Sequence, residues 1–145
     1  MLDNSILLVE DNQDDEELIK RQFRLNHVLN PVVVVRDGEE VLDYLMGWGN
    51  YRGRDTDILP GLILLDLGLP KLSGFDVLRQ LQIAPFAPQI SVVALSGSER
   101  SCAQRVMHMG AKGHVEKPLD FGVLEKTVRP LGFQWLHMKE TMRAG

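Results

Sequence analysis

The chain has 145 residues, of which 44% are hydrophobic and 25% charged, a balance that is ordinary for one globular domain and excludes a disordered protein. The formal net charge of −4 argues against non-specific binding of nucleic acid, since that function needs a basic face. No apolar run approaches the roughly 18 residues that span a bilayer, so the sequence indicates no membrane segment. A single cysteine, Cys102, excludes an internal disulfide, and the sequence therefore predicts a small acidic protein of the cytoplasm.

Short aliphatic runs alternate with stretches of helical periodicity along the first half of the chain. We expect one helix that Asn12 caps and a second around residues 41–45, because apolar side chains recur there at helical spacing. The stretch from Gly47 to Gly61 is long for a connection in a compact domain and indicates a functional or family-specific insertion. Strands that are buried on both faces are expected at residues 6–9, 32–35 and 62–65.

The same alternation continues in the second half. We expect helices at about residues 74–82 and 99–109 and a last helix that opens at Asp120, with strands at 90–95 and 113–116. Five strands that alternate with five helices pair in parallel through right-handed crossovers. The predicted fold is an α/β fold with an open, doubly wound, five-stranded parallel sheet.

Polar residues stand just past the ends of four expected strands. Glu10 and Asp11 follow the first strand, Asp66 the third, Ser96 the fourth and Lys117 the fifth. Each alone could be a helix cap, a turn residue or a surface charge. The carboxyl ends of parallel strands, however, share one edge of the sheet, which is where such folds bind ligands. The sequence thus predicts that three acids, one hydroxyl and one amine meet at this edge.

This combination of side chains indicates phosphoryl chemistry with a hard cation. Clustered carboxylates without cysteine or histidine favour Mg²⁺, which would neutralise both the acids and the oxygens of a transferring phosphoryl group. An aspartate such as Asp66 can attack a phosphoryl group and form an aspartyl phosphate. Lys117 would add a fixed positive charge, and Ser96 would add a hydroxyl donor for a phosphoryl oxygen.

Five motifs support a family resemblance: Leu8–Asn12, Leu64–Pro70 with Gly74, Ala94–Ser96, Gly110–Gly113 and Lys117–Pro118. With them the sequence resembles the receiver domain of two-component response regulators over residues 5 to about 130. The resemblance implies a flavodoxin-like sheet of strand order 2-1-3-4-5. It also implies that the Lys117–Pro118 peptide is cis, as is usual in the family.

The resemblance also assigns roles to the residues at the strand ends. It implies that Asp66 is the phosphoacceptor and that Lys117 meets the phosphoryl group. Ser96 is implied as the hydroxyl that switches position on phosphorylation. The implied ligands of Mg²⁺ are Glu10, Asp11, Asp66 and the backbone carbonyl of Gly68.

Three positions depart from the usual pattern of the family. Gly68 replaces a polar side chain that is common two places after the phosphoacceptor, a change that keeps the carbonyl ligand but affects the expected rate of dephosphorylation. Ser96 replaces a common threonine and keeps the hydroxyl. His114 stands where the family usually carries a switching Tyr or Phe, and a histidine can titrate near neutral pH. We expect a switch role for His114, with a strand-end histidine of no signalling role as the alternative.

The insertion at residues 47–61 and the C-terminal Phe133–Leu136 point to a narrower resemblance, to the single-domain regulators that partner cyanobacterial and bacterial phytochromes. The implied function is a phosphoacceptor signalling protein, not an enzyme, whose partner is a sensor histidine kinase of the phytochrome type. We expect a receiver domain at residues 1–130 and a helical arm at 131–145, with no separate output domain. Output would then come through protein contacts.

Three other functions remain as alternatives. A hydrolase with an aspartyl-phosphate intermediate usually carries a second Asp two residues after the nucleophile, where this chain has Gly68. A flavodoxin-like redox carrier needs a phosphate loop after the first strand, where Glu10 and Asp11 would repel the phosphate. A receiver-like scaffold that is never phosphorylated would not need the full set of acids.

The C-terminal arm carries an apolar stripe at heptad-like spacing, formed by Leu124, Val128, Leu131, Trp135, Met138 and Met142. We expect a break near residues 128–132, where Pro130 and Gly132 interrupt the pattern, and a second helical segment after it. Trp135, Met138 and Met142 lie beyond the expected core. We therefore expect them to join two copies into a homodimer. The alternative is that the arm folds back over its own domain.

Overall fold

The computed structural model describes residues 1–69, 72–97 and 101–137. All five strands are parallel and lie in the order β2-β1-β3-β4-β5, which confirms the predicted sheet. The strands are β1 (Ile6–Val9), β2 (Val32–Val35), β3 (Leu62–Asp66), β4 (Val92–Ser96) and β5 (Gly113–Glu116). The helices are α1 (Gln13–Leu25), α2 (Gly38–Met46), α3 (Gly74–Ile83), α4 (Ser101–His108) and α5 (Phe121–Val128).

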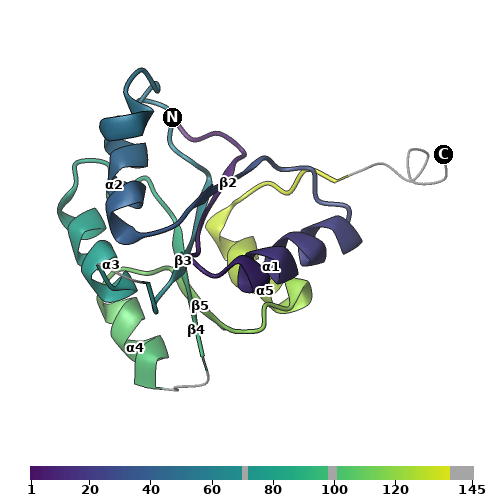
Figure 1. Ribbon diagram of the computed structural model, residues 1–145. Coiled ribbons are helices and arrows are strands. Elements are labelled where there is room, and N and C mark those ends of the chain that lie inside the picture. The colour runs from purple at the N-terminus through teal and green to yellow at the C-terminus, as the bar shows by residue number, and fades with distance from the viewer. Residues whose placement is uncertain (70–71, 98–100, 138–145) are drawn as a thin grey trace.

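The sheet lies between two layers of helices, with α2, α3 and α4 on one face and α1 and α5 on the other (Figure 1). Alternate side chains of one strand enter different cores, because successive residues of a strand point to opposite faces. In β1, Leu7 and Val9 pack on the α2–α4 side, while Ile6 and Leu8 pack on the α1–α5 side. Both faces are therefore apolar, which is why the strands read as continuous aliphatic runs.

Several element boundaries differ slightly from those predicted. Strand β4 begins at Val92 and not at Ile90, although the Ile90 side chain is buried in the core. Helix α4 ends at His108, just before Gly110, whose φ of +100° ends the helix as expected. The predicted start of that helix at residue 99 lies outside the described residues.

The long connection between α2 and β3 is tied to the body of the domain. It contains a 3₁₀ helix (Gly49–Tyr51), and the Tyr51 hydroxyl donates to Glu40 at 2.7 Å. The guanidinium of Arg54 lies over the Tyr44 ring at 4.2 Å and donates from Nε to the Tyr44 carbonyl at 2.6 Å. The insertion is thus a packed segment in the structure.

The C-terminal segment breaks where the sequence predicts. A 3₁₀ helix (Arg129–Leu131) follows α5, and Gly132 adopts a left-handed conformation with φ of +79°. The predicted second helix is wrong for residues 133–137, which are extended and lie antiparallel to residues 28–30. Asn30 explains this outcome, because its side chain donates to the Gln134 carbonyl at 3.0 Å and accepts from the Leu136 amide at 2.7 Å.

The expectation that Trp135 finds no core in its own domain is also wrong. Its ring packs against Phe23, Phe121 and Phe133, with centroid separations of 6.1, 4.9 and 5.0 Å. The alternative, an arm that folds back over its own domain, holds for residues 133–137. Met138 and Met142 lie outside the described residues, so their predicted part in a dimer stays a prediction.

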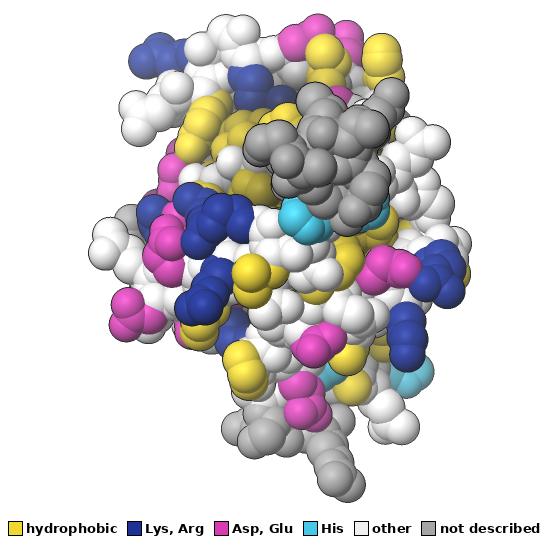
Figure 2. All heavy atoms as spheres, turned by 90° about the vertical axis from the view of Figure 1, so that its right-hand side faces the viewer, with side chains coloured by type: hydrophobic (Ala, Val, Ile, Leu, Met, Phe, Trp, Pro, Cys, Tyr) yellow, Lys and Arg dark blue, Asp and Glu magenta, His cyan; other side chains and the backbone are white. Residues whose placement is uncertain are grey.

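The face that carries α1, α5 and the C-terminal segment mixes acidic and basic side chains with scattered hydrophobic ones (Figure 2). Within the three described ranges, no helix combines the length and apolar character needed to cross a membrane. The Lys117–Pro118 peptide is cis, as the family resemblance implied.

Candidate functional site

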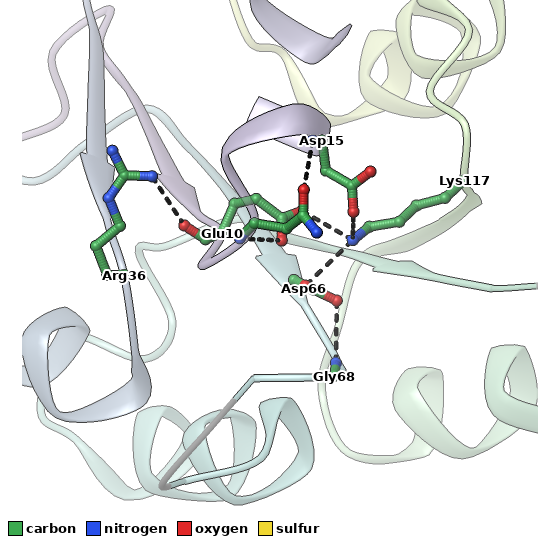
Figure 3. A network of polar contacts seen from close by, with 7 residues as sticks. Glu10, Asp15, Arg36, Asp66, Gly68 and Lys117 are labelled. Carbon is green, nitrogen blue, oxygen red and sulfur yellow. Dashed lines mark hydrogen bonds and ion pairs between the residues drawn. The ribbon is translucent and has the colours of Figure 1, made fainter. Parts of the chain in front are cut away.

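Three of the predicted polar residues meet at the carboxyl edge of the sheet, as Figure 3 shows. Glu10 follows β1, Asp66 ends β3 and Lys117 follows β5, so three strands bring these side chains together. The Lys117 ammonium lies 2.8 Å from Glu10 Oε1 and 3.1 Å from Asp66 Oδ2. The sequence-based placement of these three residues is therefore confirmed.

Asp15 is a member of the cluster that sequence reasoning missed. Its Oδ2 accepts from Lys117 Nζ at 3.0 Å (Figure 3). The sequence shows Asp15 as part of the cap of α1, where its amide donates to Asn12 Oδ1 at 3.0 Å. The position of Asp15 in the first turn of a helix that starts beside the site could have indicated its role. An acid there is also favoured by the helix dipole alone, so the position did not single it out.

The turn after Asp66 fixes one oxygen of the carboxylate. The Gly68 amide donates to Asp66 Oδ1 at 3.0 Å, while Oδ2 faces the ammonium. Gly74 lets α3 start close to this turn, since a Cβ there would lie 2.7 Å from the Asp66 carbonyl oxygen and 2.5 Å from Leu67 Cα. A glycine is thus required at position 74 by close backbone approach. At Gly68 a Cβ would make only an ordinary contact, 3.7 Å from Asp66 Oδ1.

Glu10 is fully buried, and its environment disfavours the carboxylate form. Burial, with a hydrogen bond and repulsion from Asp66, raises the pKa of Glu10 to about 7, although Lys117 acts in the opposite direction. Burial disfavours the Lys117 ammonium too, but the close contacts with the Glu10 and Asp15 carboxylates and the charge of Asp66 outweigh it and raise the pKa of Lys117. Both pKa values are raised, which favours the neutral form of Glu10 and the charged form of Lys117, because one ammonium faces three carboxylates.

Three carboxylates in the cluster fit a divalent cation. One oxygen each of Glu10, Asp11 and Asp66 can lie within 4.8 Å of the others. Glu10 Oε1 is buried without a well-directed hydrogen bond, even though Lys117 Nζ lies 2.8 Å away. Asp11 is exposed, so the cluster opens to solvent on its side. Oxygen donors of this kind, one of them with an unused lone pair, suit a hard cation such as Mg²⁺.

Arg36 and Glu16 support the turn that carries the acids, and sequence reasoning missed both. Arg36 Nη1 donates to the backbone carbonyl of Glu10 at 3.5 Å and forms an ion pair with Glu16 (Figure 3 shows the first contact). Glu16 is buried and also pairs with Lys20 at 2.6 Å; these cations lower the pKa of Glu16, with the hydrogen bond from Lys20 as the largest cause. The end of β2 is thus tied to the start of α1.

Ser96 ends β4, as predicted, and makes a contact that the sequence did not reveal. Its Oγ lies 2.6 Å from His114 Nε2 and donates to the Gly97 carbonyl at 3.1 Å. Within the part of the chain that the structure describes, this hydroxyl makes no hydrogen bond to Asp66 or Lys117. Both Ser96 and His114 are therefore at the site edge, but they are paired with each other.

Comparisons with known proteins agree with this geometry. The family model described as "Response regulator receiver domain" matches residues 6–129. The probable methanogenesis regulatory protein FilR2 of Methanothrix harundinacea is 36% identical over 133 residues, which cover 90% of this chain and 83% of that protein. Response regulator Rcp1 of Synechocystis sp. is 31% identical over 134 residues, which cover 90% of this chain and 88% of that protein.

Two solved structures are similar over most of their length. The bacteriophytochrome response regulator RtBRR has a TM-score of 0.83 and 38% identity, and the match covers 97% of this chain and 84% of that one. The Mn²⁺-bound form of Rcp1 has a TM-score of 0.71 and 28% identity, with 89% of this chain and 91% of that one covered. The shared fold extends over the whole sheet and its helices.

Proposed function

Because this chain belongs to the response regulator receiver domain family, we propose that Asp66 accepts a phosphoryl group from a sensor histidine kinase. The observation that carries the proposal is the position of the Asp66 carboxylate, which is buried at the end of β3 with Lys117 Nζ 3.1 Å from Oδ2. A single buried aspartate that faces an ammonium at a strand end is suited to nucleophilic attack on phosphorus.

The transfer exchanges one bond at phosphorus for another. A carboxylate oxygen of Asp66 attacks the phosphorus of a phosphohistidine, the new O–P bond forms, and the N–P bond of the donor breaks. The electron pair of that bond stays on the imidazole nitrogen of the kinase. Lys117 neutralises part of the charge that an incoming phosphoryl group would meet, and the Gly68 amide holds Oδ1 in place.

We propose Glu10, Asp11, Asp66 and the backbone carbonyl of Gly68 as the ligands of Mg²⁺. The buried Glu10 oxygen without a directed hydrogen bond supports this ligand set, and the Mn²⁺-bound form of a relative supports a divalent cation in this fold. When bound, Mg²⁺ neutralises charge on the phosphoryl oxygens during transfer.

The proposed kinase is of the bacterial phytochrome type. The support is the similarity to RtBRR, a bacteriophytochrome response regulator, together with the insertion at residues 47–61. We further propose that the protein works in the cytoplasm as a homodimer whose contacts include Met138 and Met142, and that its output is protein contact without nucleic acid or membrane binding. The net charge of −4 supports an output without nucleic acid, and the single cysteine supports the cytoplasm.

Incubation with acetyl phosphate and Mg²⁺, followed by intact mass, tests the phosphoacceptor. The parent should gain one phosphoryl group, and Asp66→Asn, which keeps the shape but removes the nucleophile, should gain none. Phosphoryl uptake by Asp66→Asn would overturn the assignment. The kinase class is tested separately by transfer from a phosphorylated bacterial phytochrome kinase and from an unrelated histidine kinase, of which only the first should be fast.

A further inference from the structure

The hydroxyl of Ser96 is held by the imidazole of His114, on the neighbouring strand. Strands β4 and β5 pair so that Ala94 faces His114 and Ser96 faces Glu116. From this register His114 Nε2 reaches Ser96 Oγ at 2.6 Å, the short end of the range for a hydrogen bond. Ser96 is buried, so water does not compete freely for its hydroxyl.

Proton counting shows that this hydroxyl is fully used. A serine hydroxyl has one hydrogen to donate, and a backbone carbonyl can only accept. If Ser96 donates to the Gly97 carbonyl, then His114 Nε2–H donates to Oγ; if Ser96 instead donates to Nε2, its hydrogen is spent on His114. In either arrangement the hydrogen that a phosphoryl oxygen would need points elsewhere.

We propose that His114 is a positioning residue that holds the Ser96 hydroxyl away from Asp66, so that a phosphoryl group on Asp66 must compete with the imidazole for this hydroxyl. The inference rests on the proposed function, because the competitor is the phosphoryl group. In the resting protein the direct hydrogen bond to His114 restrains Ser96. His114 therefore helps to determine how strongly Ser96 stabilises the phosphorylated site.

The size of the effect follows from the strength of one hydrogen bond. Full contact with the phosphoryl group needs a state in which Ser96 has left His114. The apparent affinity for the phosphoryl group is the intrinsic affinity multiplied by the fraction of molecules in this state. Removal of the imidazole nitrogen should therefore tighten binding of a phosphoryl analogue by about 3- to 10-fold, the range that one net hydrogen bond corresponds to.

The experiment measures equilibrium binding of beryllofluoride, a tetrahedral phosphoryl analogue, to the full chain in the presence of Mg²⁺. Four proteins form a double-mutant cycle: the parent, His114→Phe, Ser96→Ala and the double variant. We expect the dissociation constant to fall about 3- to 10-fold in His114→Phe. On the Ser96→Ala background the same substitution should leave it unchanged, because no hydroxyl remains to be released.

Each other outcome overturns a defined part of the reasoning. An equal change on both backgrounds, or no tightening in His114→Phe, would show that His114 does not act through the Ser96 hydroxyl. A parent that binds no beryllofluoride would overturn the proposed function together with the competition. Binding that is insensitive to both side chains would overturn only the competition.

A second measurement keeps the test independent of how well phenylalanine packs at position 114. The ¹⁵N resonance of the His114 imidazole Nε2 in the parent should move when beryllofluoride binds. In unliganded Ser96→Ala it should already lie away from its position in the unliganded parent. If the imidazole resonance moves neither on beryllofluoride binding nor in Ser96→Ala, the hydrogen bond does not restrain Ser96 in the resting protein.

Discussion

Replacement of Glu10 by Gln should stabilise the metal-free protein above neutral pH. The substitution keeps the shape of a fully buried side chain and removes the charge. If the ion pair with Lys117 at 2.8 Å dominated, the loss of this charge would destabilise the fold. We expect the opposite result, because burial and the neighbouring Asp66 outweigh Lys117 and raise the pKa of Glu10 to about 7.

The magnitude follows from the linkage between protonation and folding. The pKa of Glu10 is about 7 in the folded protein against its ordinary value of 4.5, and each pKa unit corresponds to about 1.4 kcal/mol. Between these values the folded state binds more protons than the unfolded state, so the free energy of unfolding falls as pH rises from 4.5 to 7. The full loss by pH 8 is about 3 kcal/mol, which Glu10→Gln should restore.

The assay is urea unfolding with EDTA at a series of pH values between 5 and 8. The difference between Glu10→Gln and the parent reports Glu10 together with its coupling to Asp66 and Lys117, since groups outside this cluster titrate alike in both. Glu16→Gln is the matched control: this buried glutamate has a lowered pKa, so its charge contributes stability above the unfolded pKa, and its replacement should destabilise at pH 8. A Glu10→Gln variant that is less stable than the parent at pH 8, or whose advantage does not depend on pH, would refute the electrostatic account.

Three further predictions concern the cation, the C-terminal segment and the assembly. Mg²⁺ at a hundredfold excess over its dissociation constant should stabilise the parent by about 2.7 kcal/mol in thermal unfolding, and Asp11→Asn should reduce this gain; an equal gain would remove Asp11 from the ligands. Asn30→Asp should destabilise the fold by about 2–4 kcal/mol in urea unfolding, and more as pH rises. The reason is that a carboxylate replaces an amide that donates to the carbonyls of Asn4 and Gln134. Unchanged stability would show that this amide does not hold the C-terminal segment. Removal of the residues after His137 should give a chain that sediments as a monomer and still accepts a phosphoryl group by intact mass. A full-length chain that is monomeric at high micromolar concentration would contradict the dimer.

The architecture and the position of the site could be predicted because both depend on simple periodic rules. Aliphatic runs mark strands buried on both faces, and parallel strands end at one edge, so Glu10, Asp66 and Lys117 had to approach one another once the fold was inferred. The start of β4 could not be predicted from apolar character, because Ile90 is apolar and buried yet lies outside the strand.

The contacts around the site could not be predicted, because they join elements far apart in the sequence. Asp15 and Lys117 are 102 positions apart, and an acid in the first turn of α1 is already accounted for locally as part of the helix cap. The C-terminal stripe matched a helix at every spacing, yet residues 133–137 are extended. The side-chain oxygen of Asn30, 106 positions before Leu136, accepts from the Leu136 backbone amide, a contact that a helical segment would not make. Tertiary contacts here override a local pattern.

The same charges that destabilise the resting site suit it for phosphoryl transfer. Glu10, Asp15 and Asp66 share one ammonium, and Asp11 adds a fourth carboxylate nearby. A phosphoryl group would bring roughly −1.5 to −2 further charge. Like charges about 4 Å apart repel by about 4 kcal/mol at the effective dielectric of a protein surface, which Lys117 alone cannot offset for so many partners. A divalent cation at the acids removes this repulsion, so cation binding and phosphorylation must favour each other by linkage. Burial first, and Asp66 second, raise the pKa of Glu10, so its carboxylate is disfavoured in the resting site, and a cation held by the proposed ligands would favour it.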